Sequence, residues 1–295
     1  MFNVNTVIQT QGLSTNSSTS TAFEEHSLER HSQFHEQKLI EKFCRATQLV
    51  KLIEGTVENF LRNYRRTRKP EEALAPLRLR LDFNYVELVE HAPQLLHLVV
   101  EEPLQFAEAV KYSVYGQVRD LLKANANDNG IKAIDIAQLH THWRLVDLPL
   151  QQNLLYNPTQ YLYRLGLALV NGFLSAYTPP ETLVLQSIWY CAGGCLRNAI
   201  QTSSTDAPLC PNCSRPMSEY QKLRVTENYR LIAVLPAECA QNPRSVDCIY
   251  RPILVRLRAH TYDGDLKLGA NYVITGYYCG TASSYQFEAC HLRKA

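Results

Sequence analysis

The stretch CAGGCLRNAIQTSSTDAPLCPNC, residues 191–213, decides the fold more than any other part of the chain. It holds two cysteine pairs, Cys191-x3-Cys195 and Cys210-x2-Cys213, separated by fourteen residues. Each pair can hold an ion from a tight turn, which glycines at 193 and 194 and the Pro-Asn dipeptide at 211–212 favour. Four thiolates satisfy the tetrahedral preference of zinc. The spacing therefore predicts one zinc ion bound by Cys191, Cys195, Cys210 and Cys213.

The predicted ion is structural, because four sulfur ligands leave no coordination position for water or a substrate. It would stabilise a module too small to build a hydrophobic core of its own. The sequence contains no phosphate loop, no dinucleotide-binding glycine motif, no HExxH and no GxSxG. His140 and His142 have no recognisable partner nucleophile, so we expect a structural role for both. The sequence predicts a binding protein without catalytic residues.

Around the cysteine module the chain changes character several times. Residues 1–21 are rich in Ser, Thr, Asn and Gln and are expected to be disordered. Apolar residues at three- and four-residue spacing predict a helical extension at 22–54 and a helical subdomain at 55–125. After the breaker NANDNG at 125–130, short strands indicate a small barrel or sandwich at 126–295, interrupted by a zinc ribbon at 189–217. The predicted fold class is α+β.

The same patterns predict individual elements. Gly55 is expected to divide the first long helix, residues 86–97 to form a short helix, and Pro103 to begin another. Residues 77–83 alternate between apolar and polar as a strand does. In the second half, we expect strands at residues 131–136, 165–174, 183–190, 222–225, 253–259 and 272–278.

Positive charge is predicted to gather on two strands, although Lys plus Arg (30) nearly balances Asp plus Glu (28) overall. Tyr220, Lys222 and Arg224 would share one face, and Arg256 and Arg258 alternate against apolar neighbours. Such a surface suits the phosphate backbone of single-stranded or duplex DNA. The alternative is an ordinary solvated strand face. The candidate DNA-binding residues are Lys222, Arg224, Arg230, Arg244, Arg251, Arg256, Arg258 and Lys267.

The sequence also indicates where in the cell the protein is found. No apolar run approaches the length of a membrane span, and the first residues, MFNVNTVIQT, lack the basic and apolar segments of a signal peptide. We therefore expect a protein that neither spans a membrane nor is secreted. Closely paired cysteines in a reducing compartment favour metal binding over disulfides.

The order of these features resembles the amino-terminal region of minichromosome maintenance (MCM) proteins over about residues 55–295. The resemblance rests on residues 57–65, 79–88, 91–96, 102–106, 157–174, 219–227 and 268–276, and on the four cysteines, which fall where the family carries its zinc insertion. It implies an OB-fold barrel after the helical subdomain, DNA and other MCM-like subunits as partners, and a nuclear location.

The chain also departs from the family pattern. Its first cysteine pair has three intervening residues instead of two, Leu268-Gly-Ala270 replaces an acidic turn, and Pro243-Arg-Ser245 is offset from the following strand. DNA-contacting residues therefore cannot be transferred from the family one by one.

The end of the chain suggests a more particular resemblance. Ala295 falls where replicative MCM proteins begin their ATPase module, as in split meiotic MCM-like proteins. This resemblance implies a non-catalytic subunit in meiotic recombination that promotes crossovers by opposing a Bloom-type helicase, with a partner supplying the ATPase-like half. The alternatives are a replication-licensing MCM subunit or a truncated isoform of one, and a zinc-ribbon adaptor for protein or RNA.

Overall fold

A computed structural model describes residues 35–67, 73–125, 134–156, 166–195, 200–202, 206–238, 251–262, 264–279 and 286–295. The segment predicted to be disordered (1–21), the breaker at 126–130 and the candidate Arg244 lie outside these ranges. Among the described helices, none combines the length and apolar character needed to cross a membrane.

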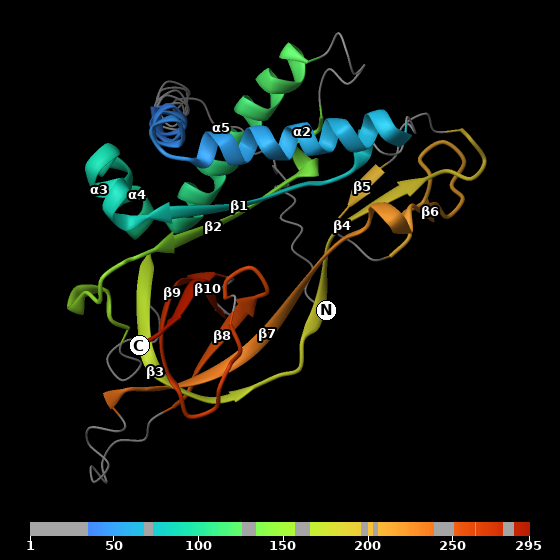
Figure 1. The fold of residues 1–295 in the computed structure, drawn as a ribbon. Helices are drawn as coiled ribbons and strands as arrows, with labels where there is room; N and C mark the ends of the chain where they lie inside the picture. Colours follow the sequence, from blue (N-terminus) through green and yellow to red (C-terminus); the bar gives the residue numbers. More distant parts are fainter. Residues whose placement is uncertain are drawn as a thin grey trace, which may run out of the picture.

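The first half of the chain forms a helical layer over a small parallel sheet (Figure 1). Residues 35–46 are helical, and α2 (Leu49–Thr67), α3 (Tyr85–His91), α4 (Pro93–Glu101) and α5 (Pro103–Ala124) follow. β1 (Leu77–Asn84) lies beneath α2 and pairs in parallel with β2 (Leu139–Val146). A column of aromatic rings, each 5.1–5.5 Å from the next, runs through the core of this layer: Phe43, Phe83, Phe106 and Trp143.

Local sequence sets the helix boundaries. The Asn84 side chain caps α3 by accepting hydrogen bonds from the next turn's backbone. Pro103 begins α5, where its missing N–H costs nothing, so that prediction is confirmed. The single helix predicted at 86–97 is wrong, because Pro93 disfavours a helical Ala92 and separates α3 from α4. The break predicted at Gly55 is also wrong, since α2 runs through it and the interruption lies at residues 47–48.

β2 is the largest departure from the predicted strands. The strand expected at 131–136 is absent from its described part, because Asp135 caps a short 3-10 helix, Ile136–Gln138, in a reciprocal capping box with Gln138. The strand begins only at Leu139 and pairs with β1. Although it falls in the range predicted for the barrel, β2 belongs to the sheet under the helices.

The second half of the chain closes into a five-stranded barrel. Its ring order is β3 (Leu167–Tyr177), β9 (Asn271–Cys279), β10 (Gln286–Lys294), β8 (Ile253–Arg258) and β7 (Val225–Pro236), which returns to β3. β8 and β10 are parallel, and the other neighbours are antiparallel. This is the connectivity of an OB fold. The predicted α+β class, with helices followed by an OB barrel, is confirmed.

The buried and exposed residues of the barrel strands show whether the inward and outward faces were predicted correctly. In β8 the residues at 253, 255 and 257 enter the core, while Arg256 and Arg258 point outward, as predicted. The strand predicted at 222–225 is wrong, because Gln221–Leu223 forms a 3-10 helix and β7 begins at Val225. Tyr220, Lys222 and Arg224 therefore do not share a strand face. The final strand, β10, was not predicted.

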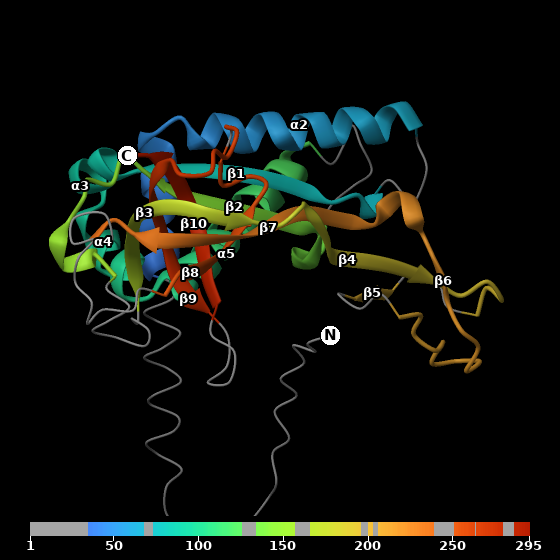
Figure 2. The ribbon, with the colours of Figure 1, turned by 90° about the horizontal axis from the view of Figure 1, so that it is seen from below.

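β4 (Glu181–Tyr190) carries the cysteine module away from the barrel. Its first part pairs with β7, and its last residues pair with β5 (Ile200–Thr202) and β6 (Ser218–Glu219). Figure 1 and Figure 2 show the module projecting at the opposite end of the molecule from α3 and α4. At its base, the rings of Tyr190 and Tyr220 lie 4.2 Å apart and Arg224 is paired with the nearly buried Glu219.

Candidate metal centre and nucleic-acid interface

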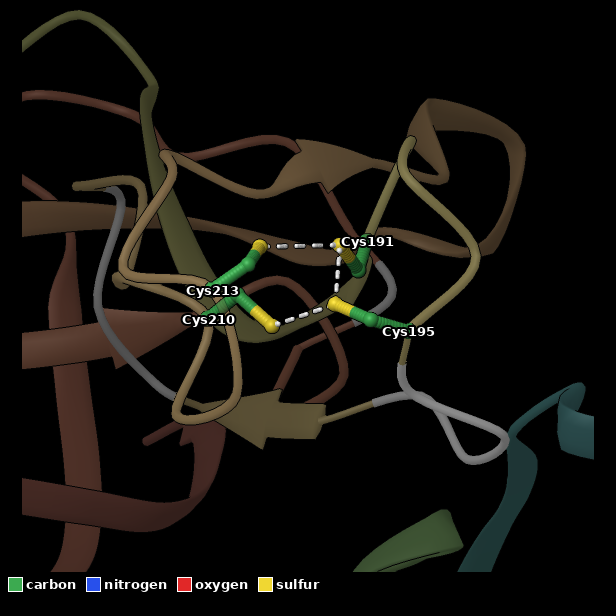
Figure 3. Close-up of side chains that lie close together, drawn as sticks. All are labelled: Cys191, Cys195, Cys210 and Cys213. Atoms are coloured by element: carbon green, nitrogen blue, oxygen red, sulfur yellow. Dashed lines mark hydrogen bonds between the residues drawn. The ribbon is translucent and has the colours of Figure 1, made fainter.

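The structure brings the four predicted zinc ligands together (Figure 3). The Sγ atom of Cys191 lies 3.2 Å from that of Cys195 and 3.6 Å from that of Cys213, and the Cys195 and Cys210 sulfurs are 3.3 Å apart. All four lie within 4.8 Å of one another. Tetrahedral Zn–S bonds of about 2.3 Å place sulfurs about 3.8 Å apart. The four cysteines could therefore hold one zinc ion.

Each cysteine pair sits on a tight turn. The backbone N–H of Gly194 donates to the Cys191 carbonyl (2.9 Å), and that of Ser214 donates to the Cys210 carbonyl (2.8 Å). Gly194 has a positive φ of 67°, so the expected glycine turn is present. In the second turn the positive φ falls on Ser214 (55°), which the sequence did not indicate. The Asn212 amide donates to the Cys195 carbonyl (2.6 Å) and links the two turns.

The surroundings of Cys191 and Cys210 lower the pKa of these two thiols and so favour the thiolate form. The Cys195 hydrogen bond and the Gly193 backbone lower the pKa of Cys191 to about 6. Burial opposes ionisation of Cys210, but hydrogen bonds led by the Asn212 backbone outweigh it and lower its pKa. Cys195 shifts the other way, because its neighbouring sulfurs raise its pKa. The thiolate, the form that binds zinc, is thus favoured at Cys191 and Cys210.

A second cluster of metal-binding side chains lies between β2 and the barrel. It joins His142 of β2, Glu227 of β7 and His260 in the turn after β8, with ligand atoms within 4.8 Å of one another. Burial, then the neighbouring His260, lowers the pKa of His142 to about 4. Burial alone would raise the pKa of Glu227, but the hydrogen bond with His260 and the nearby His142 and Arg258 outweigh it and lower the pKa to about 2. Sequence reasoning missed this cluster, because its members lie on three elements far apart in the chain.

Three of the candidate DNA-binding arginines, Arg224, Arg256 and Arg258, already face carboxylates. Arg258 pairs with Glu288 and, at 3.0 Å, with Glu227, while Arg224 pairs with Glu219. Their charge is therefore balanced within the protein, which the sequence pattern did not indicate.

Aromatic rings lie beside two of the described candidates. The guanidinium groups of Arg230 and Arg256 lie over the rings of Tyr177 and Tyr229, at 5.8 and 5.5 Å from the centroids. Arg256 is also 3.6 Å from Glu288. The remaining described candidates are Lys222, Arg251 and Lys267, which are exposed. Contact between these residues and DNA stays a prediction.

We compared the sequence and the fold with those of known proteins. No protein-family model and no curated protein matches the sequence. Among solved structures, the chain is similar to the crystal structure of the N-terminal domain of an archaeal MCM, with a TM-score of 0.53 and 12% identity over 89% of this chain and 99% of that domain. At this identity the likeness concerns the fold alone. The chain has an MCM N-terminal-like fold, as the resemblance over residues 55–295 implied.

Proposed function

We propose that this chain is a non-catalytic, DNA-binding and assembly subunit of an MCM-type complex. The proposal rests on one observation: the chain shares the fold of an archaeal MCM N-terminal domain and combines a helical layer and an OB barrel with a projecting four-cysteine module. In this proposal the chain positions nucleic acid and neighbouring subunits, and a partner subunit supplies any ATPase activity.

The barrel surface offers suitable groups for a DNA strand. Arg230 lies over Tyr177, and this pair combines a cation for phosphate with an aromatic side chain. A cavity of about 260 Å³ lies beside β7 and β8, lined in part by Tyr229, Arg230 and Tyr262. Paired aromatic and basic groups favour single-stranded DNA as the ligand.

The two ends of the molecule offer surfaces for assembly. The cysteine module projects at one end, and α3 lies at the other (Figure 2). On α3, the apolar side chains of Val86 and Val89 are 61% and 45% exposed. Different surfaces at opposite ends suit head-to-tail contacts, which form a ring when the rotation between subunits closes. Neighbouring MCM-like subunits would meet the chain at these ends.

DNA binding is tested by fluorescence anisotropy with labelled single-stranded and duplex DNA. The double variant Arg251→Glu/Lys267→Glu reverses two exposed charges beside the barrel strands β8 and β9, and Lys51→Glu/Lys123→Glu makes the same change on the helical layer. We expect affinity to fall about tenfold or more in the barrel variant, because phosphate contacts are lost. The helical-layer variant should stay near wild type. Equal affinities in the two variants would contradict binding by the barrel.

The resemblance to split meiotic MCM-like proteins supports a narrower proposal. The complex would act in the nucleus during meiotic recombination and promote crossovers by opposing a Bloom-type helicase. Co-purification from germline tissue, with partners identified by mass spectrometry, tests this role. An MCM-like partner carrying an ATPase-like half, together with recombination proteins, would support it. Recovery of the replicative MCM subunits alone would favour the replication-licensing alternative.

A further inference from the structure

Three metal-binding side chains meet where the β1–β2 sheet rests on the barrel, outside the cysteine module. The Nδ1 atom of His260 is hydrogen-bonded to Oε1 of Glu227, and Nε2 of His142 lies 3.9 Å from the same oxygen. The two imidazole rings are 3.9 Å apart, inclined by 32°. Two imidazoles and one carboxylate therefore converge on one point from three different elements.

We propose that His142, Glu227 and His260 form a second metal site, for a divalent transition metal of the zinc class. Two imidazole nitrogens and a carboxylate oxygen are a ligand set that zinc accepts, with bonds of about 2.0 Å. Such bonds place tetrahedral ligand atoms about 3.3 Å apart. The His142–Glu227 spacing of 3.9 Å is close to this value. Binding requires His260 to move outward from Glu227 and the two stacked imidazole rings to separate.

Arg258 orients the carboxylate for this role. Its Nη1 donates to Oε2 of Glu227 at 3.0 Å, which leaves Oε1 directed at the two histidines. Arg258 also contacts Glu288, whose other oxygen lies 3.6 Å from Arg256. Within this group, the two arginines balance the two carboxylates in charge. A hydrogen-bonded second layer of this kind is usual around metal ligands.

The site has an open side. His142, Glu227 and His260 line a cavity of about 510 Å³, whose wall also carries Arg78 and Arg80 from β1. Three protein ligands leave one tetrahedral position, which faces this cavity. Water or a small anion attracted by the arginines would complete the coordination. This differs from the cysteine module, where protein sulfurs fill every position.

The site lies between two layers of the molecule, so a bound ion would connect them. His142 belongs to the sheet under the helices, whereas Glu227 and His260 belong to the barrel. An ion bound by all three would join the two layers. This inference does not depend on DNA binding, and the two can fail separately.

Metal stoichiometry tests the proposal on the full chain. The protein is loaded with Zn²⁺, dialysed against a weak chelator and measured by mass spectrometry of its metal content. We expect two equivalents in the wild type and one in His142→Gln and in His260→Gln. The matched control is His140→Gln, which lies two residues from His142, bonds Gln186 and stands outside the cluster. It should keep two equivalents.

Cobalt substitution assigns each equivalent to its site. Co²⁺ bound by cysteine sulfur gives thiolate charge-transfer bands, whereas Co²⁺ bound by histidine and carboxylate gives only visible ligand-field bands. The histidine variants should lose one Co²⁺ and keep the charge-transfer bands, which also shows that the cysteine module remains folded. Cys210→Ser should lose the charge-transfer bands and keep the other ion. One equivalent in the wild type, or two in both histidine variants, would overturn the proposal.

Discussion

Asp82 on β1 and Arg144 on β2 lie directly opposite each other in the parallel register, and the guanidinium of Arg144 contacts both carboxylate oxygens of Asp82. The neighbouring Trp143 stacks on Tyr277 of the barrel, with ring centroids 6.1 Å apart. The pair therefore fixes the strand through which the helical layer contacts the barrel. Arg144 is only 10% exposed, so its charge needs this partner.

Asp82→Asn is expected to destabilise the protein in a pH-dependent way. Burial acts to raise the pKa of Asp82, but the hydrogen bonds and charge of Arg144 outweigh it, so the net pKa is lowered. The stabilisation is therefore present above the unfolded pKa near 3.8 and is lost as pH falls below it. Because Asp82 is 42% exposed, we expect a loss of about 1 kcal/mol at pH 7.

Urea denaturation at several pH values measures this difference. The control is Asp120→Asn, a 71% exposed carboxylate on α5, which should have little effect. A destabilisation by Asp82→Asn that stayed constant from pH 7 to pH 3 would show that the ion pair is not its cause.

Cys210→Ser should remove zinc from the cysteine module and unfold it, while the helical layer stays folded. The module has only a small apolar cluster, Trp189, Cys191, Cys210 and Met217, and two of its members are predicted zinc ligands. Hydrogen exchange should rise over the described residues 206–219 and stay unchanged in α2 and α5. Cys279→Ser, a cysteine of β9 outside the cluster, is the control. Protection of 206–219 in Cys210→Ser equal to that in Cys279→Ser would contradict a structural zinc ion.

Arg258→Gln is expected to lower stability, because Arg258 is held in ion pairs and is not an ordinary solvated group of the strand face. Its removal leaves Glu288, a 5% exposed residue, and Glu227 without their main cation. We expect a loss of about 2 kcal/mol, reduced from the value for a fully buried pair because Arg258 is 26% exposed. Urea denaturation at low ionic strength measures this loss, because urea does not screen ion pairs. Wild-type stability in this variant would mean that the ion pairs contribute nothing.

Gly172→Ala tests barrel closure. A Cβ at this position of β3 would lie 2.1 Å from the Leu235 carbonyl oxygen, so the strand must move away from β7. Overpacking of this kind costs about 1–3 kcal/mol. Gly116→Ala in α5 is the matched control: a Cβ there meets nothing within 4 Å, and the change should stabilise the helix by about 1 kcal/mol. Similar thermal unfolding of the two variants would contradict the β3–β7 contact.

Short-range patterns in the sequence predicted much of the fold. The cysteine spacing identified the four residues whose sulfurs converge, Pro103 marked a helix start, and alternation gave the inward and outward faces of β8. Each of these features is decided by residues a few positions apart. The resemblance to MCM proteins supplied the barrel topology, which local patterns left open between a barrel and a sandwich.

Long-range pairing could not be predicted in the same way. β2 pairs with β1 across about sixty residues, and nothing in its own sequence distinguishes that partner from a barrel strand. His142, Glu227 and His260 meet only because the barrel seats against this sheet. The alternation of Arg256 and Arg258 likewise showed which face they occupy, but not that Glu288 of β10 would balance their charge.

The salt dependence of DNA binding tests the central claim most directly. Anisotropy titrations of labelled single-stranded DNA with the wild-type chain, between about 50 and 200 mM salt, give the slope of log K against log salt. Binding along the basic barrel surface predicts a linear decline, with a slope of about −0.7 for each phosphate contacted. Saturable binding with a slope near zero, or no binding even at the lowest salt, would contradict a DNA-binding subunit.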